Sequence, residues 1–274
     1  MQPLTAMGDA ARSAIRGVFA DIDDTISTGG RVTAEAYAAM ERLRRADLLV
    51  IPITGRPAGW CDHIARVWPV DAVVGENGAL YMIHDDRARK LIKRYAVGDA
   101  DRQAARARLS AIGEHIVRTV PGCAIASDQS YREADLAIDY CEDVVPLSRA
   151  AVDRIVALMR AEGMTAKVSS VHVNGWFGAY DKLTMTRILG REAFSLDLDT
   201  RRAEFVFVGD SPNDAPMFEF FPHSVGVANV RRFADRLAAQ PKYITAHEAG
   251  AGFAEFADFL LEKGTGLRAR VCQK

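Results

Sequence analysis

Short apolar runs alternate with helix-like segments along the first part of the chain. The run from Gly17 to Ala20 ends abruptly in the acidic residues 21–24, which predicts a buried strand with carboxylates at its C-terminal end. Apolar residues then recur at helical spacing between Ala36 and Leu43, with Thr33 as a candidate N-cap, and the apolar run 48–53 follows. This order predicts a strand, helix, strand unit.

Further strand signals follow the same pattern. The run 71–74 is closed by the turn residues 75–78, and residues 79–83 have the character of a return strand. Much later, the runs 204–208 and 224–227 each predict one more short strand. Strands that alternate with helices predict a parallel sheet with helices on both faces.

The order of strand-like and helix-like segments changes between residues 85 and 180. Helix-like segments around 100–117 and 148–161 flank the strand-like runs 136–140 and 166–173. We predict an α/β fold in which a doubly wound, Rossmann-like parallel sheet core carries an inserted α+β cap domain. The expected core comprises residues 1–85 and 180–274, and the expected cap comprises residues 86–179.

Composition narrows the function classes. The 274 residues are 49% hydrophobic and 26% charged, and 35 basic residues nearly balance 36 acidic ones. This balance gives no electrostatic support for binding nucleic acid or a membrane surface, so a small molecule is the expected partner, and the oligomeric state is left open. Single cysteines at positions 61, 123, 141 and 272, and the lack of a signal-like or membrane-spanning run, favour a cytoplasmic protein.

Polar residues with complementary chemistry follow three of the predicted strands. Asp21 and Asp23 follow the first, Thr54 and Gly55 follow the second, and a late strand ends in the segment 209–214. Ligands of open parallel sheets bind beyond the carboxyl ends of the strands. Gathered carboxylates repel one another unless a cation neutralises them, and oxygen ligands suit Mg²⁺. Phosphoryl transfer is a reaction that enzymes carry out with carboxylates, hydroxyl groups, a lysine and Mg²⁺.

These segments, with Lys182 at the start of a predicted helix, resemble the four motifs of the haloacid dehalogenase-like superfamily. The likeness is to the Cof-type and sucrose-phosphate-phosphatase-like branch (subfamily IIB), which carries a C2-type cap between the second and third motifs. It extends over nearly the whole chain, because the segments 76–79, 181–182, 225–229 and 243–245 also resemble members of this branch.

The resemblance implies a role for each matching residue. Asp21 would be the nucleophile that forms an aspartyl-phosphate, and Asp23 would be the general acid and base. Thr54, the backbone N–H of Gly55 and Lys182 would hold the phosphoryl oxygens. Mg²⁺ would be bound by the Asp21 carboxylate, the Asp23 carbonyl and Asp210, with Asn213 and Asp214 completing or orienting its ligand shell. The implied activity is Mg²⁺-dependent hydrolysis of a small phosphorylated metabolite, with a sugar phosphate as the expected substrate.

Substrate contacts are harder to predict from the sequence. His172 and Asn174 alternate with valines, so they share one face of a predicted strand. With Asn77 and Arg132 they form the set of candidate substrate contacts. Asp24 stands where many members of the branch have glycine, and our hypothesis is that its negative charge tunes metal affinity or disfavours strongly anionic substrates.

Two alternatives remain open at this stage. A phosphomutase of the same superfamily has the same core motifs but needs a second, basic phosphate site, for which Arg132 and Lys167 are candidates. A non-catalytic protein that binds phosphorylated metabolites is the other alternative, although such proteins usually lose the nucleophile or the acid, and Asp21 and Asp23 are both present.

Overall fold

The computed structural model describes residues 1–262. Its central sheet has six strands, and all of its neighbouring pairs are parallel. In spatial order the strands are β1 (Gln2–Pro3), β15 (Tyr243–Ile244), β14 (Val225–Gly226), β13 (Phe205–Gly209), β2 (Gly17–Ala20) and β5 (Leu49–Pro52). The predicted parallel α/β core is confirmed.

Helices cover both faces of this sheet because its strands are apolar on both sides. Val18 and Ala20 pack into one core, whereas Phe19 packs into the other, where its ring centre lies 5.5 Å from that of Phe205. The first face is covered by α2 (Ala34–Arg45), α3 (Ala58–Val67) and α9 (Ala249–Leu261), and α1 (Asp9–Ala14) packs at its edge. The second face is covered by α6 (Lys182–Phe194), α7 (Leu198–Arg201) and α8 (Ala215–Phe220).

A second sheet extends the core beside β5. It consists of β6 (Val73–Gly75), β7 (Leu80–Asp85) and β8 (Lys90–Tyr95), and a parallel bridge from Ile53 to Val74 connects it to the end of β5. The predicted domain boundary at residue 86 therefore falls in the turn between β7 and β8. A small hairpin of β3 (Ser27–Thr28) and β4 (Arg31–Val32) follows the acidic residues after β2.

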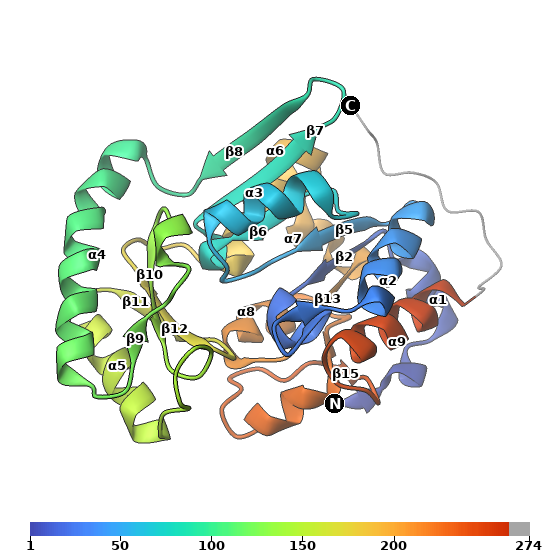
Figure 1. The fold of residues 1–274 in the computed structure, drawn as a ribbon. Coiled ribbons are helices and arrows are strands. Elements are labelled where there is room, and N and C mark those ends of the chain that lie inside the picture. Colours follow the sequence, from blue (N-terminus) through green and yellow to red (C-terminus); the bar gives the residue numbers. More distant parts are fainter. Residues whose placement is uncertain (263–274) are drawn as a thin grey trace.

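The inserted segment forms a separate layer, drawn in green to yellow in Figure 1. Its antiparallel sheet has the order β11 (Thr165–Val168), β12 (His172–Trp176), β10 (Asp135–Asp139) and β9 (Ala124–Ile125). The helices α4 (Asp99–Thr119) and α5 (Arg149–Ala161) pack on this sheet around a core of their own. The predicted inserted α+β cap is therefore present.

Other sequence features have direct structural counterparts. The side chain of Thr33 caps α2 by accepting a hydrogen bond from the Ala36 N–H, as predicted. Cys61, Cys123 and Cys141 are free thiols, and Cys272 lies outside the described residues, as do positions 263–274 of the predicted core. Within residues 1–262, no helix combines the length and the apolar character that a membrane span requires.

Candidate active site

The ends of three adjacent strands bring the predicted residues together. Asp21 directly follows β2, and Asp210 directly follows the neighbouring strand β13; Thr54 lies two residues beyond β5, on the other side of β2. The parallel register continues past the strands, because the Asp21 N–H donates to the Val208 carbonyl at 2.9 Å. The carboxyl edge of the sheet therefore places all three side chains on one site.

Lys182 enters this site from the first turn of α6. Asp181 caps the helix by accepting a hydrogen bond from the Thr184 N–H at 2.7 Å, which fixes where the helix begins. The Lys182 Nζ is buried and donates to Asp21 Oδ1 at 2.8 Å and to Asp214 Oδ1 at 2.7 Å. These two carboxylates raise the pKa of Lys182 against the opposing effect of its burial, so the lysine stays charged.

Three buried carboxylates surround the ammonium group. Asp21, Asp210 and Asp214 each offer an oxygen within 4.8 Å of the others. Burial raises the pKa of Asp21 to about 8, and the charges of Asp214 and Asp23 add to this effect while Lys182 opposes it. Burial and the neighbouring Asp21 likewise raise the pKa of Asp210 well above its ordinary value. A bound cation would relieve this cost, and an all-oxygen donor set fits Mg²⁺.

The individual carboxylates are held in different ways. Asp210 accepts hydrogen bonds from Thr25 Oγ1 at 3.4 Å and from Asn229 Nδ2 at 3.1 Å. Asp214 accepts from the backbone N–H groups of Asp210 and Ser211 in addition to Lys182, so much of its bonding capacity serves to orient the loop. The Asn213 Oδ1 accepts a hydrogen bond from Ser211, and Asn213 lines a small pocket together with Asp21.

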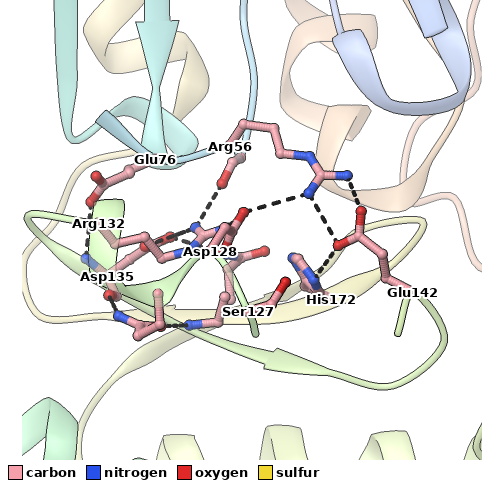
Figure 2. A network of polar contacts seen from close by, with 12 residues as sticks. Arg56, Glu76, Ser127, Asp128, Arg132, Asp135, Glu142 and His172 are labelled. Carbon is pink, nitrogen blue, oxygen red and sulfur yellow. Dashed lines mark hydrogen bonds and ion pairs between the residues drawn. The ribbon is translucent and has the colours of Figure 1, made fainter. Parts of the chain in front are cut away.

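The Asp23 side chain lies apart from this cluster and pairs with Arg56. The Arg56 Nε donates to both Asp23 oxygens, at 2.9 and 3.1 Å, and its other nitrogens contact Glu142 and Asp128 of the cap. Figure 2 shows this arginine reaching from the core toward the two cap carboxylates. Arg56 is buried, and its charge is balanced by carboxylates of both domains.

Thr54 and Gly55, in the loop after β5, contact Asn77 of the turn after β6. The Thr54 Oγ1 accepts from the Arg56 N–H at 2.9 Å, and the Asn77 N–H donates to the Thr54 carbonyl at 3.0 Å. A Cβ atom on Gly55 would lie 3.1 Å from the Asn77 amide, so a glycine allows this close approach. The Asn77 Nδ2 is buried and has no hydrogen-bond partner among residues 1–262.

The cap covers this site tightly. The catalytic pocket, a space of only about 10 Å³, is lined by Asp21, Asp23 and Gly55 from the core and by His172 and Asn174 from the cap. Of the four predicted substrate contacts, these last two line the pocket, whereas Asn77 and Arg132 do not.

Arg132 instead ties the cap to the core. Its guanidinium is fully buried, donates to Asp128 and Asp135 of the cap, and reaches the Gly55 carbonyl at 2.8 Å. Nearby, Glu76 of the core accepts four backbone hydrogen bonds, from Ala58, Glu133, Ala134 and Asp135. Figure 2 shows Glu76 and Arg132 side by side in this connection.

Four residues of the site had no predicted role: Arg56, Glu76, Glu142 and Asn229. Asn229 follows β14, the next parallel strand, so the rule that polar groups gather at strand ends could have identified it. Arg56 directly follows the predicted residues Thr54 and Gly55, but its partner Glu142 is 86 residues away in sequence. Nothing local to either residue indicates that pairing.

Comparisons with known proteins place this geometry in context. No family model matches the chain. A phosphoglycolate phosphatase from Methanothrix thermoacetophila is 26% identical over 252 residues, which cover 91% of this chain and 99% of the relative. A phosphoglycolate phosphatase from Haloarcula marismortui is 27% identical over 242 residues, which cover 87% of this chain and 94% of the relative.

Solved structures resemble the fold over most of its length. A HAD/Cof-like hydrolase from Plasmodium vivax has a TM-score of 0.64 at 15% identity, covering 93% of this chain and 99% of that one. The sucrose-phosphatase of Synechocystis sp. PCC6803, solved with sucrose and phosphate, has a TM-score of 0.60 at 16% identity, covering 89% and 98%. The chain therefore has the haloacid dehalogenase-like fold, in the cap-bearing form shared by Cof-like and sucrose-phosphatase structures.

Proposed function

We propose that this protein is a Mg²⁺-dependent phosphatase that hydrolyses a small phosphorylated metabolite through a phosphorylated Asp21. One observation carries the proposal: Asp21 lies buried at the C-terminal end of β2, 2.8 Å from Lys182 and grouped with Asp210 and Asp214. The phosphatase relatives and the shared fold support a phosphoric monoester hydrolase.

The first step is attack by Asp21 on phosphorus. The Asp21 oxygen forms a bond to phosphorus while the bond from phosphorus to the leaving oxygen breaks. Lys182, Thr54 and the backbone N–H of Gly55 bind the phosphoryl oxygens and balance their charge. Asp23 gives a proton to the leaving oxygen and later takes one from the water that hydrolyses the aspartyl-phosphate.

The metal would be held by Asp21 and Asp210, with the Asp23 carbonyl, Asn213 and Asp214 around it. A bound Mg²⁺ supplies positive charge next to the transferring phosphoryl group. Neighbouring side chains hold the metal ligands in place, since Thr25 and Asn229 orient Asp210 and Lys182 orients Asp214.

The relatives differ in the substrates that their names state. The curated ones are phosphoglycolate phosphatases, whereas the structural neighbours include a sucrose-phosphatase and a trehalose-6-phosphate phosphatase. We retain a sugar phosphate as the proposed substrate class. The phosphomutase alternative needs a basic second phosphate site, and Arg132, a candidate for it, is already held by Asp128 and Asp135.

Phosphate release from a panel of sugar phosphates and phosphoglycolate, with and without Mg²⁺, tests this function. The parent is expected to release phosphate only with the metal, and Asp21→Asn is expected to lose at least about 1000-fold in rate. Asp153→Asn, on the exposed side of α5, serves as the matched control and should keep the parent's rate. Release by Asp21→Asn at the parent's rate would refute the nucleophile, and no release by the parent would refute the hydrolase.

A further inference from the structure

A cavity of about 450 Å³ opens beside Asp23, between the β3–β4 hairpin and the start of α3. We call it the aromatic cavity, because three aromatic side chains line it: Trp60, Trp68 and Tyr131. The aliphatic side chains of Ile22, Val32 and Ile64 make its walls mostly apolar. Asp23, Ser27 and His63 add polar side chains. A concave, mainly apolar space of this size with few polar groups is typical of a small-molecule site.

The aromatic cavity adjoins the catalytic pocket, since Asp23 lines both. In the proposed mechanism Asp23 protonates the leaving oxygen, so the leaving group must lie against Asp23. The catalytic pocket has a volume of only about 10 Å³, far smaller than the 450 Å³ of the aromatic cavity. Of these two adjoining spaces, the aromatic cavity is the one large enough for a leaving group, and Asp23 lines it.

Two large aromatic side chains at this cavity are exposed to solvent. Trp60 is 40% exposed and Tyr131 is 58% exposed, and gathered apolar exposure of this kind indicates a binding surface. The two come from different domains, because Trp60 lies on α3 of the core and Tyr131 lies in the cap. Tyr131 packs on Gly59, the residue before Trp60, where an added Cβ atom would stand 2.9 Å from the Tyr131 Cβ. The cavity is therefore completed by the cap.

We propose that the leaving group of the substrate carries a ring, and that the apolar face of this ring packs in the aromatic cavity against Trp60 and Tyr131. This inference rests on the proposed phosphatase function and specifies its substrate. Pyranose and aromatic rings both present such a face. The hydroxyl groups of a pyranose would form hydrogen bonds with Asp23, Ser27 and His63. Phosphoglycolate has no ring and would leave the cavity unused.

Three phosphate esters test the proposal: glucose 6-phosphate, phenyl phosphate and phosphoglycolate. Trp60→Ala and Tyr131→Ala should each lower kcat/KM for the preferred ring-bearing ester at least tenfold more than for phosphoglycolate, mainly through KM. Ile92→Ala removes a similarly exposed apolar side chain on β8, outside the cavity, and should leave this ratio unchanged. Preference for glucose 6-phosphate would identify a sugar ring, and preference for phenyl phosphate an aromatic one.

The outcomes separate this inference from the function on which it rests. Hydrolysis of phosphoglycolate alone, or an equal loss on all three esters, would overturn the ring site and leave the phosphatase standing. If the parent hydrolyses none of them, the phosphatase fails, and calorimetric binding of the three esters to Asp21→Asn decides the ring site. If adding Trp60→Ala to Asp21→Asn weakens binding of the ring-bearing esters only, the ring site is supported. If no ester binds, or if binding of all three weakens equally, the ring site is overturned.

Discussion

Asp24 occupies a left-handed backbone conformation, with a φ of 53°. Glycine adopts this region freely, which gives a physical reason for the glycine that the family resemblance leads us to expect at this position. The Asp24 charge is one of the causes that raise the pKa of Asp210, after burial and the charges of Asp21 and Asp214. We predict that Asp24→Gly changes stability by no more than about 1 kcal/mol and raises the Mg²⁺ concentration needed for half-maximal activity.

A Mg²⁺ titration of phosphate release measures this effect. Asp47→Gly is a suitable control, because Asp47 has a similar φ of 59° and follows α2, and its titration should match that of the parent. Overlapping curves for Asp24→Gly and the parent would remove any role of the Asp24 charge in metal binding.

Some residues of the site could be predicted from the sequence, and others could not. Asp21, Thr54 and Asp210 were placed together because each follows a parallel strand, and the structure brings them to one edge of the sheet. Lys182 needed the family resemblance, since a lysine at the start of a helix is common. The Arg56 pair with Glu142 was beyond prediction, because it depends on how the cap docks on the core.

One element that joins the two domains is the turn Glu76–Gly78, before β7. The buried Glu76 carboxylate accepts N–H groups from three successive cap residues, 133–135, and from Ala58. Glu76→Gln keeps the size but turns an NH₂ group toward these donors, so some of them lose their acceptor. We predict a loss of about 1–3 kcal/mol in the free energy of unfolding and faster amide exchange at residues 133–135.

Urea unfolding and hydrogen exchange measure the two effects. Glu114→Gln on α4, where the side chain is 62% exposed, is the matched control and should change neither. Unchanged exchange at residues 133–135 in Glu76→Gln would mean that this carboxylate does not hold the cap.

At the same scale, elements with a strong local pattern were the predictable ones. The buried runs that became β2, β5 and β13 stand out because every residue in them is apolar or small. β8 lies within the segment that was assigned to the cap, and it pairs with β7 at the edge of the second sheet. Its sequence, Lys90–Tyr95, mixes charged and apolar residues, and only pairing with β7 makes it a strand.

Over the whole molecule, cap and core are linked by charges that respond to pH. Burial alone would raise the pKa of Glu142, but its contacts with His172 and Arg56 outweigh burial and lower the pKa from 4.5 to about 2. A lowered carboxyl pKa stabilises the fold above the unfolded value and ceases to do so as the pH falls toward the folded one. We predict that the free energy of unfolding falls more steeply below about pH 4.5 in the parent than in Glu142→Gln.

Urea unfolding at a series of pH values measures the two slopes. Glu41→Gln, which removes a carboxylate that is 46% exposed, should keep the parent's slope. Parallel curves for the parent and Glu142→Gln would show that the Arg56–Glu142 pair contributes nothing to the pH dependence.

Metal binding should stabilise the molecule as a whole, because it relieves the repulsion among Asp21, Asp210 and Asp214 in the folded state only. A ligand at 100 times its dissociation constant contributes about 2.7 kcal/mol. For a chain of this size that corresponds to a rise in Tm on the order of 5 °C or more. We predict this rise when Mg²⁺ is added after treatment with a chelator, measured by calorimetry at constant ionic strength.

Asp210→Asn should abolish the rise, whereas Asp153→Asn should preserve it. A rise that persists in Asp210→Asn would place the stabilising ion elsewhere, and no rise in the parent would argue against a metal at this site.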